Sequence, residues 1–170
     1  MRPVDGTGVR LEPQLAAHAD ELYAILSDPA LYTYTDEKEP QSAAWLRERF
    51  GRLEARTSTD RSEDWLNWVV RNGSGVALGY VQATVTPDGD AEIAYVLGRG
   101  YWRRGHGFEA VSLMLGELGA SYGAKRATAT LDPRNAASLA LLSKLGFALI
   151  EENPAEEEVR YARDLPGEMR

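Results

Sequence analysis

The stretch that decides the fold reads A-Y-V-L-G-R-G-Y-W-R-R-G-H-G-F-E-A and runs from Ala94 to Ala110. Its apolar beginning predicts a strand. Two glycines follow, Gly105 and Gly107, and they allow the backbone to turn tightly and to approach a ligand closely. Apolar residues then recur at helical spacing, which predicts a helix directly after the glycines. The apolar face of this helix consists of Phe108, Val111, Leu115, Leu118 and Tyr122.

A helix that begins at such a turn is suited to bind an anion. Its first N–H groups have no partner within the helix, and its dipole is positive at this end. Arg103 and Arg104 add positive charge, whereas His106 lies inside the loop and is expected to offer its backbone amide. The segment therefore fits a pyrophosphate. The alternative is that the glycines only form a tight turn and that the arginines are ordinary surface charges.

The remainder of the chain predicts an α+β fold. Upstream of the glycines, three apolar runs joined by short turns predict an antiparallel meander, which disfavours a dinucleotide-binding βαβ unit. The first helix is expected to leave His18 exposed. The expected order is β-α-α-β-β-β-α-β-α-β-β. The corresponding ranges are 9–13, 15–26, 42–53, 67–71, 76–85, 92–97, 108–122, 126–131, 135–145, 147–152 and 158–163.

Length and composition restrict the function. The chain has 170 residues, of which 44% are hydrophobic and 26% charged, and this predicts one domain over residues 1–170. No apolar run is long enough for a membrane span, and a cytoplasmic protein is expected. The net charge of −7 disfavours nucleic acid as a partner. The lack of cysteine excludes disulfides, thiolate metal sites and an acyl-cysteine intermediate, and no metal is expected.

A second motif follows the glycine turn and reads N-A-A-S-L-A-L-L-S-K-L-G-F, from Asn135 to Phe147. Asn135 is a good helix cap, and Gly146 is suited to end the helix. Packing explains the leucines of this helix but leaves Ser138 without a role. A hydroxyl at this place could contact a ligand that lies along the sheet.

Taken in order, the two segments resemble the GNAT superfamily of acyl-CoA N-acyltransferases. The pyrophosphate loop of that superfamily is similar to W-R-R-G-H-G, from Trp102 to Gly107, with Trp at the place of Gln or Arg. Trp at this place, followed by Glu109 and Ala110, resembles the branch of the ribosomal-protein N-terminal acetyltransferases in particular. The resemblance implies a strongly bent mixed sheet of about seven strands flanked by about four helices.

The resemblance also implies where acetyl-CoA would bind. A-E-I-A-Y-V-L, which ends in Tyr95, Val96 and Leu97, is similar to the splayed fourth strand, whose backbone pairs with the pantetheine arm. The pantetheine would lie where this strand and the next diverge. Asn135 and Ser138 belong to a segment that is similar to the second cofactor motif.

In this family the neutral amine attacks the thioester directly, which agrees with the lack of cysteine. Backbone amides near Tyr95 and Val96 are the expected oxyanion donors. Many members carry a tyrosine as thiol acid where this chain has Leu142, so the resemblance assigns Ser138 as the donor to the thiolate instead. Glu92 is the candidate base, directly or through water, and a solvated surface role is its alternative.

The acceptor amine has no recognisable pattern. Tyr32 and Tyr34 are candidates for the acceptor pocket, with a role as core aromatics as the alternative. The acceptor is expected to be a protein N-terminus or a small-molecule amine, and a homodimer is left open. Two further hypotheses are a non-catalytic acyl-CoA-binding module with the same fold and a purely structural protein.

Overall fold

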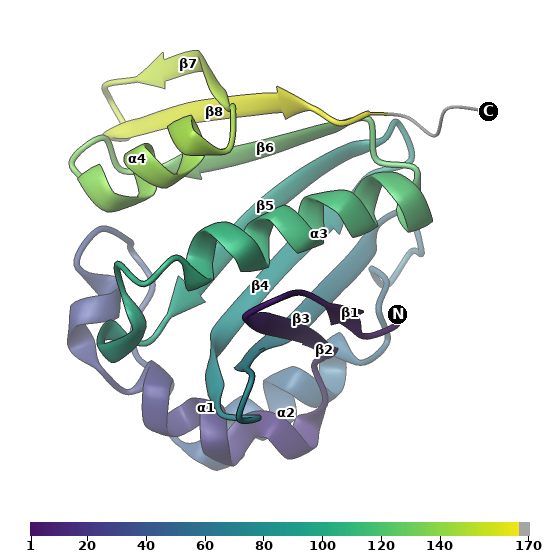
Figure 1. The fold of residues 1–170 in the computed structure, drawn as a ribbon, viewed down its shortest axis with the longest axis vertical. Helices are drawn as coiled ribbons and strands as arrows, with labels where there is room; N and C mark the ends of the chain where they lie inside the picture. Colours follow the sequence, from purple (N-terminus) through teal and green to yellow (C-terminus); the bar gives the residue numbers. More distant parts are fainter. Residues whose placement is uncertain (167–170) are drawn as a thin grey trace.

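The computed structural model describes residues 1–166, whose strands form one eight-stranded mixed sheet in the order β1-β2-β3-β4-β5-β6-β8-β7 (Figure 1). The expected fold class and order of elements are confirmed, and β1 is an additional strand. The strands are β1 (Val4–Asp5), β2 (Val9–Pro13), β3 (Asp64–Asn72), β4 (Ala77–Val85), β5 (Asp90–Leu97), β6 (Arg126–Leu131), β7 (Ala148–Asn153) and β8 (Glu158–Asp164). The helices are α1 (Ala19–Leu26), α2 (Ala43–Leu53), α3 (His106–Tyr122) and α4 (Ala136–Lys144), with 3₁₀ turns η1 (Ala16–His18), η2 (Pro29–Tyr32) and η3 (Arg99–Tyr101).

The sheet contains a single parallel pair of neighbouring strands. Every neighbouring pair of strands is antiparallel except β5 and β6, which are parallel and are joined by the long helix α3. A parallel connection needs such a crossover, because the chain must return to the same end of the sheet. In Figure 1, α3 runs across the strands. In that view α4, β6, β7 and β8 lie above α3, and β1 to β4 lie below it or behind it.

Side chains of β3 and β4 alternate between the two faces of the sheet, and each face is covered by different helices. Trp68 and Val81 are direct neighbours that pack into the core beneath α3. Val69 and Tyr80 are the next pair and pack against α1 and α2. We call these the α3 face and the α1/α2 face. Because cross-strand partners share a face, the register assigns the other strand residues to one face or the other.

The start of the first helix differs from the expectation. His18 is only 8% exposed, so the prediction that it lies exposed is wrong. Its Nδ1 accepts a hydrogen bond from the Leu15 amide at 2.9 Å, and its Nε2 lies 3.5 Å from Glu12 Oε1. The chain enters α1 through the 3₁₀ turn η1, which has a tighter winding than an α-helix and turns His18 inward.

The helix boundaries have local causes. Ser42 precedes α2, and its hydroxyl accepts a hydrogen bond from the Trp45 amide at 3.0 Å. Gly123 ends α3 in a left-handed conformation with φ of 64°. None of the helices in residues 1–166 combines the length and the apolar character that crossing a membrane requires.

Candidate functional site

The site is built around an opening between β5 and β6. These strands pair only from Asp90 to Glu92 on β5 and from Arg126 to Thr128 on β6. Both strands continue beyond the last pair, but their backbones no longer face each other. Strand β5 stays paired with β4 as far as Leu97. One edge of β5 therefore keeps its N–H and C=O groups free for another partner.

A glycine on β4 supports this geometry. Gly79 pairs with Leu97 at the far end of β5 and has a φ of +152°. A Cβ at this position would lie 2.0 Å from the Val96 carbonyl oxygen, so only glycine fits. The end of β5 can therefore pack closely against β4 in the region where β5 no longer pairs with β6. Sequence reasoning missed this glycine because it lies inside an apolar run that otherwise indicates an ordinary strand.

The loop after β5 leads into the exposed end of α3. Trp102 donates its indole Nε1–H to the Leu97 carbonyl oxygen at 2.7 Å, which ties the loop to the end of the strand. Arg103 and Gly105 have positive φ angles of 59° and 82°, and α3 begins at the next residue, His106. The first amides of α3 are free of helical partners, as at every helix start.

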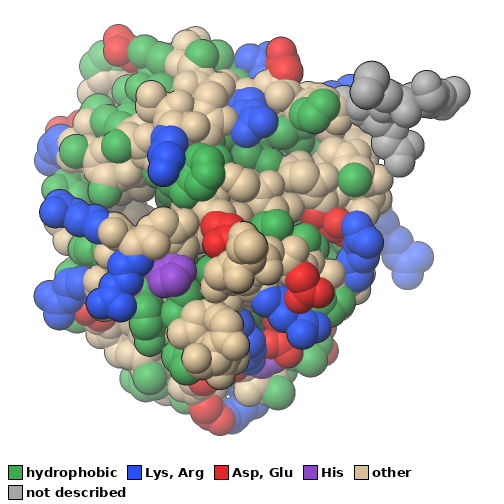
Figure 2. All heavy atoms as spheres, in the orientation of Figure 1, with side chains coloured by type: hydrophobic (Ala, Val, Ile, Leu, Met, Phe, Trp, Pro, Cys, Tyr) green, Lys and Arg blue, Asp and Glu red, His purple; other side chains and the backbone are tan. Residues whose placement is uncertain are grey.

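Positive charge dominates at this end of α3. Arg103 and Arg104 are exposed, and Figure 2 shows Lys and Arg side chains gathered around a hollow between α4 and the start of α3. Glu109 also lies in the first turn, but its carboxylate accepts hydrogen bonds from the N-terminal segment, including one of 2.8 Å from the Gly8 amide. Burial raises the pKa of Glu109, but the hydrogen bonds from Gly8, Val9 and Thr7 outweigh it and lower the pKa.

Helix α4 borders the opening on the β6 side and carries the second motif (Figure 1). The Asn135 side chain caps it by accepting a hydrogen bond from the Ser138 amide at 3.1 Å, which confirms the predicted cap. Ser138 is half-buried, and its hydroxyl contacts the phenol of Tyr95. Burial raises the pKa of Tyr95, and this contact opposes the rise. Leu142 is fully buried in the core, so its side chain is part of the packing.

Glu92 belongs to the opposite side of the sheet from Ser138. It is exposed and pairs with Thr84 on β4 and with Thr128 on β6. By register these three residues share the α1/α2 face. Glu92 is also the last residue of β5 that pairs with β6, so it lies where the opening begins. We call the loop from Arg103 to Gly107 the cradle. The opening is thus bordered by the cradle and Ser138 on one face and by Glu92 on the other.

The two tyrosines of the η2 region have different environments. Tyr32 is half-buried, and its hydroxyl donates to the Leu26 carbonyl oxygen at 2.8 Å. Tyr34 is 44% exposed. It is close enough to Arg134, in the loop before α4, to contribute to the raised pKa of that guanidinium, whose main cause is Asp132. The exposed Tyr34 therefore lies near the start of α4, whereas the Tyr32 hydroxyl is engaged in the fold.

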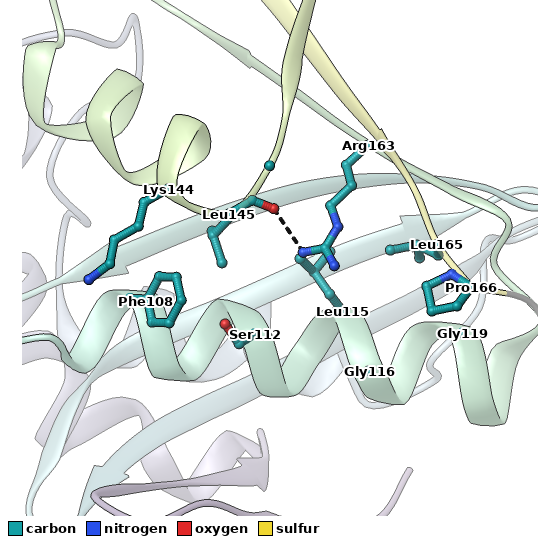
Figure 3. Close-up of a pocket in the computed structure, with 11 residues that line it drawn as sticks. Phe108, Ser112, Leu115, Gly116, Gly119, Lys144, Leu145, Arg163, Leu165 and Pro166 are labelled. Carbon is teal, nitrogen blue, oxygen red and sulfur yellow. Dashed lines mark hydrogen bonds between the residues drawn. The ribbon is translucent and has the colours of Figure 1, made fainter.

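A groove of about 510 Å³ runs along the outer side of α3 (Figure 3). At one end, Lys144 Nζ lies 4.4 Å from the centre of the Phe108 ring. Further along, Arg163 donates to the Leu145 carbonyl oxygen at 2.8 Å. Phe108 is in the first turn of α3, so the groove adjoins the loop from Arg103 to Gly107. Residues 1–166 contain no cluster of three or more His, Asp or Glu side chains that could hold a metal.

The structure brings most of the sequence-predicted residues to the opening. Tyr95, Val96 and Leu97 lie on the part of β5 that has lost its β6 partner, and the loop from Arg103 to Gly107 follows it directly. Tyr32 lies near Tyr80, the β4 partner of Val96, and its hydroxyl is bonded to the backbone of α1.

Comparisons with known proteins agree with this geometry. Residues 9–148 match the family model described as an acetyltransferase (GNAT) domain. None of the curated proteins searched matches the chain.

Three solved structures illustrate the likeness of fold. An acetyltransferase (GNAT family) from Bacillus anthracis has a TM-score of 0.77 at 17% identity, over 95% of this chain and 98% of that one. A ribosomal L7/L12 alpha-N-protein acetyltransferase in complex with coenzyme A has a TM-score of 0.81 at 17% identity, over 94% and 96%. A ribosomal-protein-S5-alanine acetyltransferase from Vibrio fischeri has a TM-score of 0.80 at 14% identity, over 96% and 96%.

The family match covers the second strand, the meander, the glycine loop and both helices that border the opening. It therefore includes the elements that form the site, and the chain belongs to the GNAT acetyltransferase family.

Proposed function

We propose that the protein is an N-acetyltransferase that moves the acetyl group of acetyl-CoA directly to a primary amine, with residues 1–170 acting as one domain. The observation that carries this proposal is the opening between β5 and β6, which leads from a free strand edge to the exposed N-terminus of α3. An extended ligand with an anionic middle and an amide-containing arm fits these two features. Membership of the GNAT family supports the same activity.

The residues around the opening fit acetyl-CoA. The cradle from Arg103 to Gly107 would hold the pyrophosphate through backbone amides and positive charge. Gly107 leaves room there, because a Cβ on it would meet only Leu97 Cδ1 at 3.5 Å and Leu141 Cδ2 at 3.6 Å. The free edge of β5 would pair with the amide groups of pantetheine. Asn135, which caps α4, would border the cofactor on the far side of the opening.

When bound, acetyl-CoA supplies the acetyl group as an activated thioester. Glu92 accepts a proton from the acceptor amine, directly or through water, so that the nitrogen lone pair is free to attack the carbonyl carbon. Amides near Tyr95 and Val96 stabilise the negative charge that develops on the carbonyl oxygen. When the C–S bond breaks, the electron pair stays on sulfur, and the Ser138 hydroxyl donates a hydrogen bond to the thiolate. The proton that the attached nitrogen must still lose passes through water to the thiolate or to solvent, which leaves the neutral amide and free CoA.

The two faces of the sheet separate these roles. Ser138 approaches from the α3 face, where the cradle lies, and Glu92 from the α1/α2 face. Acceptor and cofactor would therefore meet from opposite sides, which agrees with direct transfer and needs no covalent enzyme intermediate. Tyr34 is the exposed side chain of the two tyrosines considered for the acceptor pocket. The likeness in fold to two ribosomal-protein acetyltransferases supports testing protein N-termini among the acceptors.

The direct test measures release of free CoA from acetyl-CoA with a panel of peptide N-termini and small amines, together with the mass of the acetylated product. The proposal expects a mass increase of one acetyl group on at least one primary amine. Binding of acetyl-CoA without transfer to any acceptor would instead support a non-catalytic acyl-CoA-binding module. Leu142, at the place of the family's tyrosine, is the observation that favours this second candidate.

A further inference from the structure

Arg160 on β8 has an unusual environment. It is half-buried, and its Nη2 donates to the Thr128 hydroxyl at a long distance of 3.4 Å. Its Nε is shielded from solvent and has no hydrogen-bond partner. Among residues 1–166, no carboxylate forms an ion pair with this guanidinium. Its cross-strand neighbour on β7 is the exposed Glu151, whose carboxylate is not within ion-pair distance. The guanidinium is therefore partly removed from water without a carboxylate in direct contact in the described part of the fold.

This lack of a partner is unexpected in an acidic protein. The chain has 26 acidic and 19 basic side chains, excluding histidine, so carboxylates are in excess. Half-buried Arg71, for comparison, is paired with both Glu12 and Glu21. Arg163, also half-buried, donates to the Leu145 carbonyl oxygen. A buried charge without a partner is costly for stability, and such groups in native proteins call for an explanation.

The position of Arg160 suggests what the partner is. Its cross-strand neighbour on β6 is Thr130, and its guanidinium reaches back to Thr128, which is the direct neighbour of Glu92. By register all four residues share the α1/α2 face. Adjacent strands lie about 4.8 Å apart, so an anion on Arg160 would lie roughly 10 Å or less from Glu92.

We infer that Arg160 binds a carboxylate of the acceptor, so that the acceptor is a primary amine with a carboxylate a few bonds from its nitrogen. This inference rests on the proposed function, because it places the reacting amine at Glu92. A guanidinium matches a carboxylate with two parallel hydrogen bonds. In Arg160 these come from the two terminal nitrogens, because Nε is shielded from solvent and Nη2 has only the long contact to Thr128. The carboxylate belongs either to a small amino acid or to the side chain of an acidic residue at a peptide N-terminus.

The experiment uses pairs of acceptors that differ only in charge. The small-molecule pair is 4-aminobutyrate and 4-aminobutanamide, and the peptide pair is Asp-Ala-Ala-amide and Asn-Ala-Ala-amide. We expect the acid of at least one pair to be acetylated with a kcat/KM about 10- to 100-fold above its neutral partner, because the neutral partner leaves the guanidinium unpaired. The pair that shows the difference identifies the source of the carboxylate.

Variants then assign this preference to Arg160. In Arg160→Met the ratio between acid and amide should fall to about one, and in Arg160→Lys it should be intermediate because the two-point geometry is lost. Arg126→Met is the matched control. Arg126 lies on β6, is exposed on the same face of the sheet as Arg160, and its loss changes the net charge equally. That control should retain the ratio. A melting temperature of Arg160→Met equal to or above that of the wild type would support a functional rather than structural role.

Binding separates this inference from the proposed function. The acids and amides are titrated calorimetrically into CoA-loaded wild-type and Arg160→Met protein. If no acceptor is acetylated but the wild type binds the acid of one pair and Arg160→Met does not, the proposed function fails and the inference on Arg160 stands. Equal kcat/KM for acid and amide in the wild type, or a ratio that survives in Arg160→Met, would overturn the inference. The inference would also be overturned if Arg160→Met had a strongly lowered melting temperature but bound the acids as tightly as the wild type.

Discussion

The two faces of the sheet hold their candidate site residues in different ways. On the α3 face, the site follows from local backbone conformation: Gly105 has a left-handed φ at the start of α3, and Asn135 caps α4. On the α1/α2 face, Glu92, Thr128 and Arg160 come from three strands and meet only through register. The proposed cofactor site is thus made largely of backbone groups and the proposed acceptor site of side chains.

This difference determines how each half would respond to mutation. A site made of backbone amides is insensitive to most side-chain changes, but it fails when a bulky group fills it. A site made of side chains fails when one functional group is removed and the shape is kept. The predictions below test this contrast, beginning with the largest expected effect.

Gly107→Trp should have the largest effect on cofactor binding. A Cβ at Gly107 has ordinary contacts with Leu97 and Leu141, so the much larger indole needs further space at the start of α3, beside the proposed pyrophosphate site. We expect the Kd for CoA to rise by about 100-fold or more, since several hydrogen bonds to a charged group are lost together. Calorimetric titration of CoA measures this, and circular dichroism verifies the fold.

Gly107→Ala is the matched control. Its methyl group fits at distances of 3.5 and 3.6 Å from the nearest side-chain carbons, so the loss of affinity should be at least tenfold smaller than for Trp. If folded Gly107→Trp protein bound CoA as tightly as the wild type, the assignment of the cradle would be wrong.

Glu92→Gln tests the other face. The change keeps the shape of the side chain but removes its ability to accept a proton, so kcat/KM for the acceptor should fall by about 100-fold. The Kd for CoA should stay within a factor of two, because Glu92 lies on the α1/α2 face. Asp90→Asn is the control, as Asp90 is exposed two residues earlier on the same strand face. Equal losses in both variants would point to a general charge effect in place of a base.

Ser138→Ala should have a smaller effect on turnover. Without the hydroxyl, the departing thiolate loses one hydrogen bond, and we expect kcat to fall by about tenfold with little change in CoA affinity. Steady-state kinetics with a saturating acceptor measures this. Ser143→Ala, in the exposed part of the same helix, should retain full activity. If Ser138→Ala had an unchanged kcat, the proposed role in stabilising the leaving group would be ruled out.

The geometry of the proposed cofactor half could be predicted from the sequence because it is local. Gly105, the arginines before it and Asn135 lie at helix starts, and glycine and cap preferences are properties of short segments. The structure confirms the cap and shows that Gly105 forms the tight turn in a left-handed conformation. The burial of His18 could not be foreseen, since a 3₁₀ turn in place of the first α-helical turn changes which side chains point inward.

The acceptor half could not be predicted in the same way. Arg160 is 68 residues from Glu92 in the chain, and their shared face follows only from the register of β5, β6 and β8. A one-residue shift in any of these pairings would place Arg160 on the other face. The role of Gly79 could not be predicted either. Only glycine fits at this position because Val96 on the next strand approaches its backbone closely.

The last prediction concerns how α3 is attached to its face. Glu117 in α3 is only 4% exposed and accepts a hydrogen bond of 2.7 Å from Arg2. This hydrogen bond lowers the pKa of Glu117 below its usual range and outweighs burial. A lowered pKa in the folded state adds stability above the unfolded value of about 4.3, and this stability is lost as the pH falls through the folded value.

Glu117→Gln should therefore lower the stability by about 1 kcal/mol at pH 7, because Arg2 is largely exposed and the pair is screened by solvent. Thermal melts would show a loss of about 2 to 4 °C, and the difference from the wild type should shrink as the pH falls below about 4. Glu48→Gln, which removes an exposed helical ion pair with Arg52, should cost less than about half as much. A difference that stayed constant from pH 7 to pH 3 would show that the Glu117 side chain acts through packing, since packing does not depend on its charge.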